Sequence, residues 1–80
     1  MPLVVDASVA LAWALPDESS AYAEAVLIVA ENEGLRVPEL CSHYAAYVDL
    51  ASREKLTLAT LDAAMRKAAQ QFGITIFRQE

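Results

Sequence analysis

Two aspartates in this chain each follow a short apolar run and precede a segment of helical character. Asp6 comes directly after Leu3–Val5. Asp62 follows the short run 58–60 after one intervening residue. A carboxylate beside a buried strand is costly unless something pairs with it. Two carboxylates brought together repel, so either one keeps a proton at neutral pH or a divalent cation lies between them. Ligation by oxygen alone suits Mg²⁺ or Mn²⁺.

Both acids also have a structural interpretation. Aspartate is a good N-cap residue, worth about 1 kcal/mol to a helix. For Asp62, capping and ligand binding are equally compatible with the sequence. For Asp6 the capping interpretation is less favoured, because Ser8 is the more natural cap of the helix that follows. A functional role is therefore the preferred interpretation of Asp6.

The elements that must position these acids are short and alternate between strand and helix. Apolar runs predict four strands, at 3–5, 35–37, 58–60 and 74–77. Apolar spacing, caps and stops predict four helices, from Ser8 to Pro16, from Ser19 or Ser20 to Gly34, from Ser42 to Lys55 and from Asp62 to Gly73. Such alternation predicts one α/β domain, residues 1–80, with a small parallel sheet and flanking helices. Ligands of open α/β sheets gather at the carboxyl ends of the strands, so both acids should face one cleft.

Composition and charge exclude several classes of protein. The formal net charge of −5 argues against binding nucleic acid through a broad basic surface. The single cysteine, Cys41, excludes an intramolecular disulfide, and no leader or membrane span is evident, so we expect a cytoplasmic protein without a membrane partner. A hydrophobic fraction of 56% in 80 residues predicts apolar surface left exposed on a monomer, and hence self-association.

Two longer stretches carry a resemblance to a known family. VVDASVALAWALPDES near the N-terminus and LTLATLDAAMRKAAQQFGI near the C-terminus resemble the PIN domain, specifically the VapC-type toxin ribonucleases of toxin–antitoxin pairs. The resemblance implies a hydrolase that cleaves RNA with Mg²⁺ or Mn²⁺, with Asp6 and Asp62 as catalytic acids and metal ligands. It implies supporting roles for the hydroxyls of Ser8 and Thr60. It also implies a homodimer and an antitoxin protein as partner.

The chain departs from the family between about residues 40 and 43, where the family's middle helices are missing. This truncated PIN-like fold places Tyr44 where the third acid is expected, so two of the four family acids are absent. Glu39 is the best-placed substitute acid, whereas Asp49 is expected to be a surface carboxylate. Since the missing acids would have supported a second metal, we expect weak binding of one ion and an activity much reduced or absent.

Two other interpretations stay open. A catalytically inactive PIN remnant would serve as a module that binds an antitoxin-like peptide. An unrelated small α/β domain, such as a phosphate-accepting receiver, is disfavoured because the second acid at the first strand and the later lysine are missing. A P-loop is excluded, since the chain has only Gly34 and Gly73.

Aromatic and basic residues complete the set of expectations. Trp13, Tyr22 and Phe72 lie at helical spacing among aliphatic residues and are expected in the core. Arg66 and Lys67 follow Asp62 by one turn, where a solvated helix face is favoured over contact with an RNA phosphate. The candidate contacts of a dimer are Trp13, Tyr22, Val26 and Val29.

Overall fold

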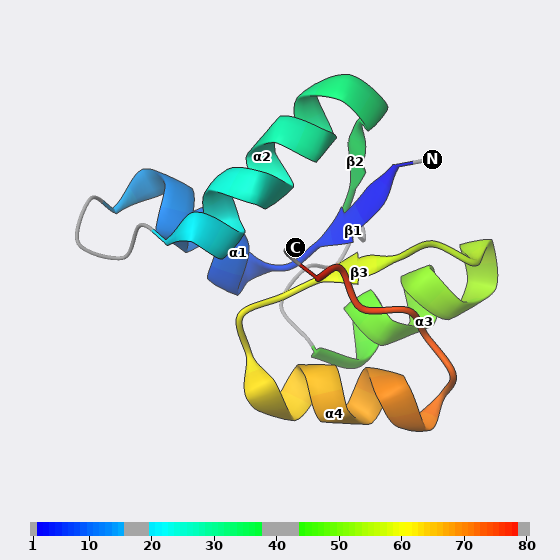
Figure 1. Ribbon diagram of the computed structural model, residues 1–80. Coiled ribbons are helices and arrows are strands. Elements are labelled where there is room, and N and C mark those ends of the chain that lie inside the picture. The colour runs from blue at the N-terminus through cyan, green and yellow to red at the C-terminus, as the bar shows by residue number, and fades with distance from the viewer. Residues whose placement is uncertain (1, 16–19, 38–43, 79–80) are drawn as a thin grey trace.

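A computed structural model describes residues 2–15, 20–37 and 44–78 (Figure 1). Its elements, in chain order, are β1 (Leu3–Val5), α1 (Ala7–Ala14), α2 (Ala21–Glu33), β2 (Leu35–Arg36), α3 (Tyr44–Glu54), β3 (Leu58–Ala59) and α4 (Ala63–Gln71). The predicted α/β class with a small parallel sheet and flanking helices is confirmed. No helix in these ranges is long and apolar enough to cross a membrane.

The sheet has three strands in the order β2-β1-β3, all parallel. β1 is central, with Leu3 opposite Leu35 and Val5 opposite Ala59. The fourth predicted strand, 74–77, is reduced to one parallel bridge between Ile76 and Leu58. Because all strands run the same way, the carboxyl ends of β1 and β3 lie at the same edge.

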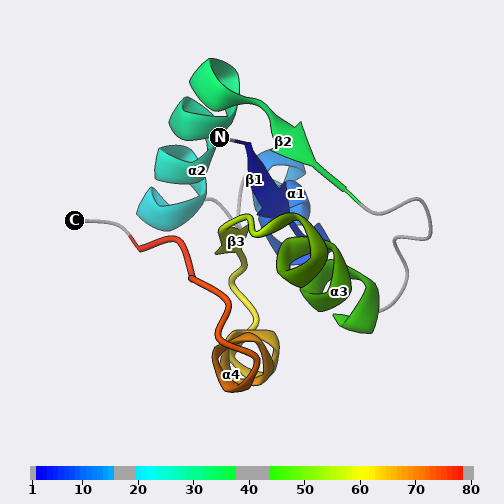
Figure 2. The same cartoon turned by 90° about the vertical axis from the view of Figure 1, so that its right-hand side faces the viewer.

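The two faces of the sheet are covered by different helices (Figure 2). Val4 packs into a core formed with α3 and α4, whereas Leu3 and Val5 pack into a second core formed with α1 and α2. Side chains alternate across a strand, so a strand buried on both faces must be apolar throughout. This explains the uninterrupted apolar run before Asp6.

Local signals set the ends of the helices, with one exception to the predictions. The Ser20 hydroxyl accepts a hydrogen bond from Ala23 N and caps α2, while Gly34 ends that helix at φ +87°. Asp62 caps α4, as its position predicts. The prediction that Ser8 rather than Asp6 caps the first helix is wrong, because Asp6 is the N-cap of α1 and Ser8 lies inside the helix.

The burial of the aromatic residues is only partly as predicted. Trp13 and Tyr22 pack against the α1–α2 core, but Phe72 is 70% exposed at the end of α4. The prediction that Phe72 belongs to the core is therefore wrong. Val26 has no exposed surface, so it cannot contribute to a dimer contact of this protomer. The predicted Ser42 cap and the shortened 40–43 segment lie outside the described residues.

Candidate functional site

The carboxylate of Asp6 is buried at the end of β1, with 3% of the residue exposed. Its Oδ1 accepts hydrogen bonds from Ser8 Oγ at 2.6 Å and Val9 N at 3.3 Å. Its Oδ2 accepts one from Thr60 Oγ1 at 2.5 Å. The N-terminus of α1 adds a favourable partial positive charge. The buried charge is therefore compensated by three protein donors, which is what its placement beside a core requires.

Thr60 follows β3 and connects the two acids. Its hydroxyl donates to Asp6 Oδ2 and accepts from Asp62 N at 3.0 Å. The Ser8 hydroxyl works in parallel, because it donates to Asp6 Oδ1 and accepts from Leu61 N at 2.9 Å. Each hydroxyl thus donates its single proton in a hydrogen bond to Asp6. Together the hydroxyls join the strand end that carries Asp6 to the turn that carries Asp62.

Asp62 is exposed and has a structural task of its own. Its Oδ1 accepts hydrogen bonds from Ala64 N at 2.9 Å and Met65 N at 3.2 Å, which caps α4. Within the described part of the chain, Oδ2 accepts no hydrogen bond from the protein, and the residue is exposed, so this oxygen has the capacity to bind a ligand. The predicted structural and functional interpretations of Asp62 are thus compatible, since they use different oxygens.

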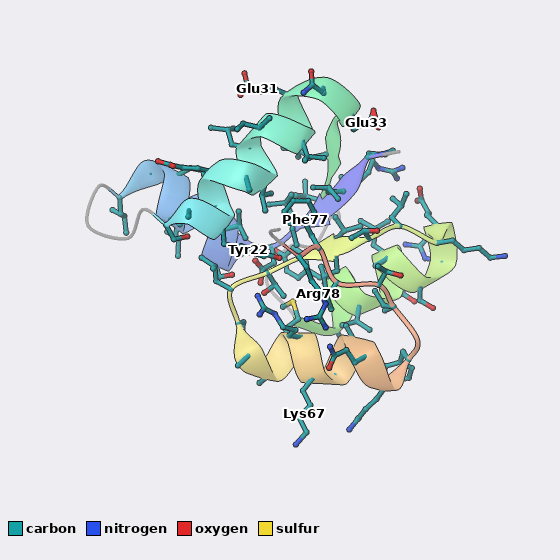
Figure 3. The ribbon with its side chains drawn as sticks, in the orientation of Figure 1. Tyr22, Glu31, Glu33, Lys67, Phe77 and Arg78 are labelled. Atoms are coloured by element: carbon teal, nitrogen blue, oxygen red, sulfur yellow. The ribbon has the colours of Figure 1, made fainter. Side chains whose placement is uncertain are left out.

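Two residues for which the sequence favoured a core or a surface position approach this site. The Tyr22 hydroxyl accepts from Thr60 N at 3.3 Å and donates to the carbonyl of Phe77 at 2.8 Å, and the two rings meet edge to face (Figure 3). Arg66 Nη2 donates to the Thr60 carbonyl at 2.6 Å. The signal for Tyr22 was weak but present, because a buried tyrosine usually finds a partner for its hydroxyl.

Burial raises the pKa of the Tyr22 phenol above its ordinary value of 10.0, although the Thr60 N–H and the Arg66 charge act in the opposite direction. The folded protein therefore holds this proton more tightly than the unfolded chain does. We expect the free energy of unfolding to fall as the pH rises above 10.0, up to the raised pKa. Urea unfolding on both sides of that pH measures the fall, and it should be smaller in Tyr22→Phe. An equal fall in both proteins would contradict this assignment.

The other sequence candidates lie apart from this cluster. Asp49 is exposed and pairs with Arg53 one turn later, as expected of a surface carboxylate. Lys67 is exposed and points away from the body of the protein (Figure 3). The expected solvated face therefore holds for Lys67 but not for Arg66, which folds back onto Thr60. Glu39 lies outside the described residues.

The oxygens at this edge fit a hard divalent cation in type but are few in number. Two carboxylates supported by two hydroxyls are oxygen donors of the kind that Mg²⁺ and Mn²⁺ prefer. Within the described ranges, no group of three or more His, Cys, Asp or Glu residues is placed to hold a metal. Mg²⁺ keeps several waters and takes one or two protein carboxylates, so the donor set suits a single hydrated ion.

The fold and the site together define a small parallel α/β protein with an acidic cluster at the carboxyl edge of its sheet. Comparison with models of protein families, with curated proteins and with solved structures finds no match for this chain.

Proposed function

We propose that this chain is a shortened PIN-like protein, related to the endoribonuclease toxins, whose Asp6 and Asp62 bind one Mg²⁺ or Mn²⁺ ion. The observation that supports the proposal best is the linkage of both aspartates through the Thr60 hydroxyl at one sheet edge. The two sequence stretches that resemble the family contain all the residues of this linkage. The expected activity is RNA cleavage at a much reduced level.

The protein residues have distinct tasks in this proposal. Asp6 supplies a carboxylate that Ser8 and Thr60 hold in one orientation, so it is preorganised before any ligand arrives. Asp62 supplies the accessible oxygen Oδ2 from a capped helix end. A bound divalent ion supplies an activated water and stabilises the charge that develops at a phosphodiester.

The reduced activity follows from the number of acids. Two-metal hydrolysis needs oxygens that bridge and flank two ions about 3.5–4 Å apart. Asp6 already accepts three hydrogen bonds, and Asp62 uses one oxygen as a cap. The pair thus has too few free oxygens for a second ion, and one ion alone provides weaker stabilisation of the leaving group.

The test of this function is Mn²⁺-dependent cleavage of a mixture of structured RNAs by the purified protein. We expect slow cleavage that depends on Mn²⁺ and is lost in Asp6→Asn. Asp49→Asn is the matched control, because it removes the same charge from an exposed carboxylate of α3 that pairs with Arg53 and takes no part in the hydrogen bonds of Asp6 and Asp62. It should cleave like the unaltered protein.

Cleavage at the same rate in Asp6→Asn would indicate a contaminating nuclease and contradict the enzymatic proposal. Absence of cleavage in every variant would also contradict it and would favour the second candidate below. A titration with Mn²⁺, measured by electron paramagnetic resonance, then decides whether the acids still bind an ion.

The second candidate is a PIN remnant without catalytic activity that binds an antitoxin-like peptide. It is favoured by an apolar groove of about 250 Å³ beside Asp6. The residues that line the groove include Ala10 and Trp13 of α1, and Leu35, Val37 and Tyr47. An amphipathic peptide that binds the purified protein, and that binds the Leu35→Glu variant more weakly, would support this candidate.

We also propose self-association through apolar side chains that the fold leaves uncovered. Leu11 and Leu15 of the α1 end, and Leu27 and Ile28 of α2, are each at least 40% exposed. They add to the contacts predicted from the sequence, of which only Val26 is buried; Trp13, Tyr22 and Val29 keep part of their surface exposed. Light scattering at micromolar concentration is expected to give the mass of a dimer, and Ile28→Glu is expected to shift it toward 8.7 kDa. A monomer in both proteins would exclude the dimer.

A further inference from the structure

The peptide backbone of Thr60 is bonded from two sides by side chains of other elements. Its N–H donates to the hydroxyl of Tyr22 on α2, and its carbonyl accepts from Nη2 of Arg66 on α4. Thr60 itself has no exposed surface. A threonine whose N–H, carbonyl and hydroxyl are all bonded has one orientation available, so its hydroxyl direction is fixed by these partners.

Arg66 is held in this position by more than one interaction. Its guanidinium carbon lies 5.3 Å from the centroid of the Tyr22 ring, a distance suited to a cation–π interaction. Its Nε is buried without a hydrogen-bond partner among the described residues. A long side chain on a helix surface usually extends into water. Folding back therefore has to be compensated by the Thr60 carbonyl and the Tyr22 ring.

A change in the orientation of Thr60 would affect both Asp6 and Asp62. The Thr60 hydroxyl donates to Asp6 and accepts from the backbone of Asp62, so a rotation of the Thr60 peptide would loosen both bonds. Arg66 and Asp62 also share α4, where Arg66 N donates to the Asp62 carbonyl at 3.0 Å. Arg66 thus ties the start of α4 to the end of β3, which are the two segments that place the acids.

We infer that Arg66, with the Tyr22 ring against it, is a positioning residue of the acidic site: it orients Thr60, and through Thr60 it sets the relation of Asp6 to Asp62. The inference rests on the proposed function for its consequence, which is the affinity for a divalent ion. Groups that orient metal ligands typically change metal affinity by about 10–100-fold when they are removed.

The direction in which the Mn²⁺ affinity changes distinguishes a positioning role of Arg66 from a purely electrostatic one. A positive charge near two carboxylates repels a cation, so loss of that charge alone should strengthen binding of Mn²⁺. Loss of an orienting group should weaken it. Arg66→Met removes both the charge and the donor, and its effect on affinity therefore has opposite signs under the two explanations.

The experiment measures Mn²⁺ binding by electron paramagnetic resonance, at a temperature where circular dichroism shows every variant to be folded. Arg66→Met is expected to bind Mn²⁺ about tenfold or more weakly than the unaltered protein. Arg66→Lys keeps a charged donor for the Thr60 carbonyl and is expected to recover most of the affinity. Lys67→Met is the matched control, because it removes the same charge from a side chain that points away from the site.

Amide hydrogen exchange provides a second readout that needs no metal. Exchange at the Thr60 and Asp62 amides is expected to be faster in Arg66→Met than in Arg66→Lys, since both amides bond to groups that Arg66 holds in place. The inference is overturned if Arg66→Met binds Mn²⁺ as well as the unaltered protein or better. If the unaltered protein binds no Mn²⁺, the proposed metal site fails, and the exchange rates alone decide the inference. Equal rates in the two variants would then overturn it.

Discussion

Thr60→Val is expected to lower the free energy of unfolding by about 3 kcal/mol, although valine has nearly the shape of threonine. The substitution removes the hydroxyl that donates to Asp6 and accepts from Asp62 N. It leaves the buried Asp6 carboxylate with one donor fewer, and a charged group is the most costly kind to leave without a partner. Urea unfolding followed by circular dichroism measures the loss.

Two further variants test the cause of this effect. Thr60→Ser keeps the hydroxyl and removes only a methyl group, so it should lose about 1 kcal/mol or less. In an Asp6→Asn background the carboxylate charge is absent, and Thr60→Val should then cost clearly less than in the unaltered protein. If Thr60→Val costs the same in both backgrounds, the hydroxyl does not act through the Asp6 charge.

The sequence allows the fold to be predicted because its signals are local. The apolar run at Leu3–Val5 is typical of a strand covered on both faces, and Ser20, Gly34 and Asp62 mark helix ends by their own conformational preferences. The predicted strand at 74–77 is less local, because its pairing depends on how the segment after α4 approaches β3. Only Ile76 forms a bridge there.

The sequence predicts only part of the hydrogen-bonded cluster, because Tyr22 and Arg66 are not among its candidates, and it does not predict the connections. Asp6, Ser8, Thr60 and Asp62 are all anticipated, yet the bond from Thr60 to Asp6 joins residues 54 positions apart. Spacing along the chain does not report such a contact. The same limitation explains why the cap of α1 was assigned to the wrong residue. The preference of serine for a cap position is a local signal. The position of Asp6, in contrast, is fixed by its hydrogen bond with Thr60 and by the strand before it.

Arg66 and Phe72 show how tertiary structure overrides a helical pattern. Both belong to the α4 region, where periodicity predicted a solvated Arg66 and a buried Phe72. The structure has Phe72 70% exposed and has Arg66 folded back toward β3. Met65 and Ala69 of α4 pack into the α3–α4 core, whereas Phe72 is the C-cap and follows the last residue of the helix.

Leu58→Ala is the substitution of an apolar residue with the largest expected effect on stability, a loss of about 3–4 kcal/mol. Leu58 has no exposed surface, and its N–H and carbonyl bond to Thr75 and Phe77. The side chain lies in the α3–α4 core with Val4 and Ile76. A domain of 80 residues has roughly 4–12 kcal/mol of stability in total, so this loss is a quarter or more of the total.

Leu27→Ala is the matched control, because it makes the same chemical change on α2 at a side chain that is 40% exposed. Thermal unfolding at low protein concentration should show a loss below about 1 kcal/mol for this variant. A small loss in Leu58→Ala would mean that the α3–α4 core closes around the cavity. Because β3 leads directly into Thr60, a large loss in Leu58→Ala would mean that the acidic site depends on the packing of this core as well as on its own hydrogen bonds.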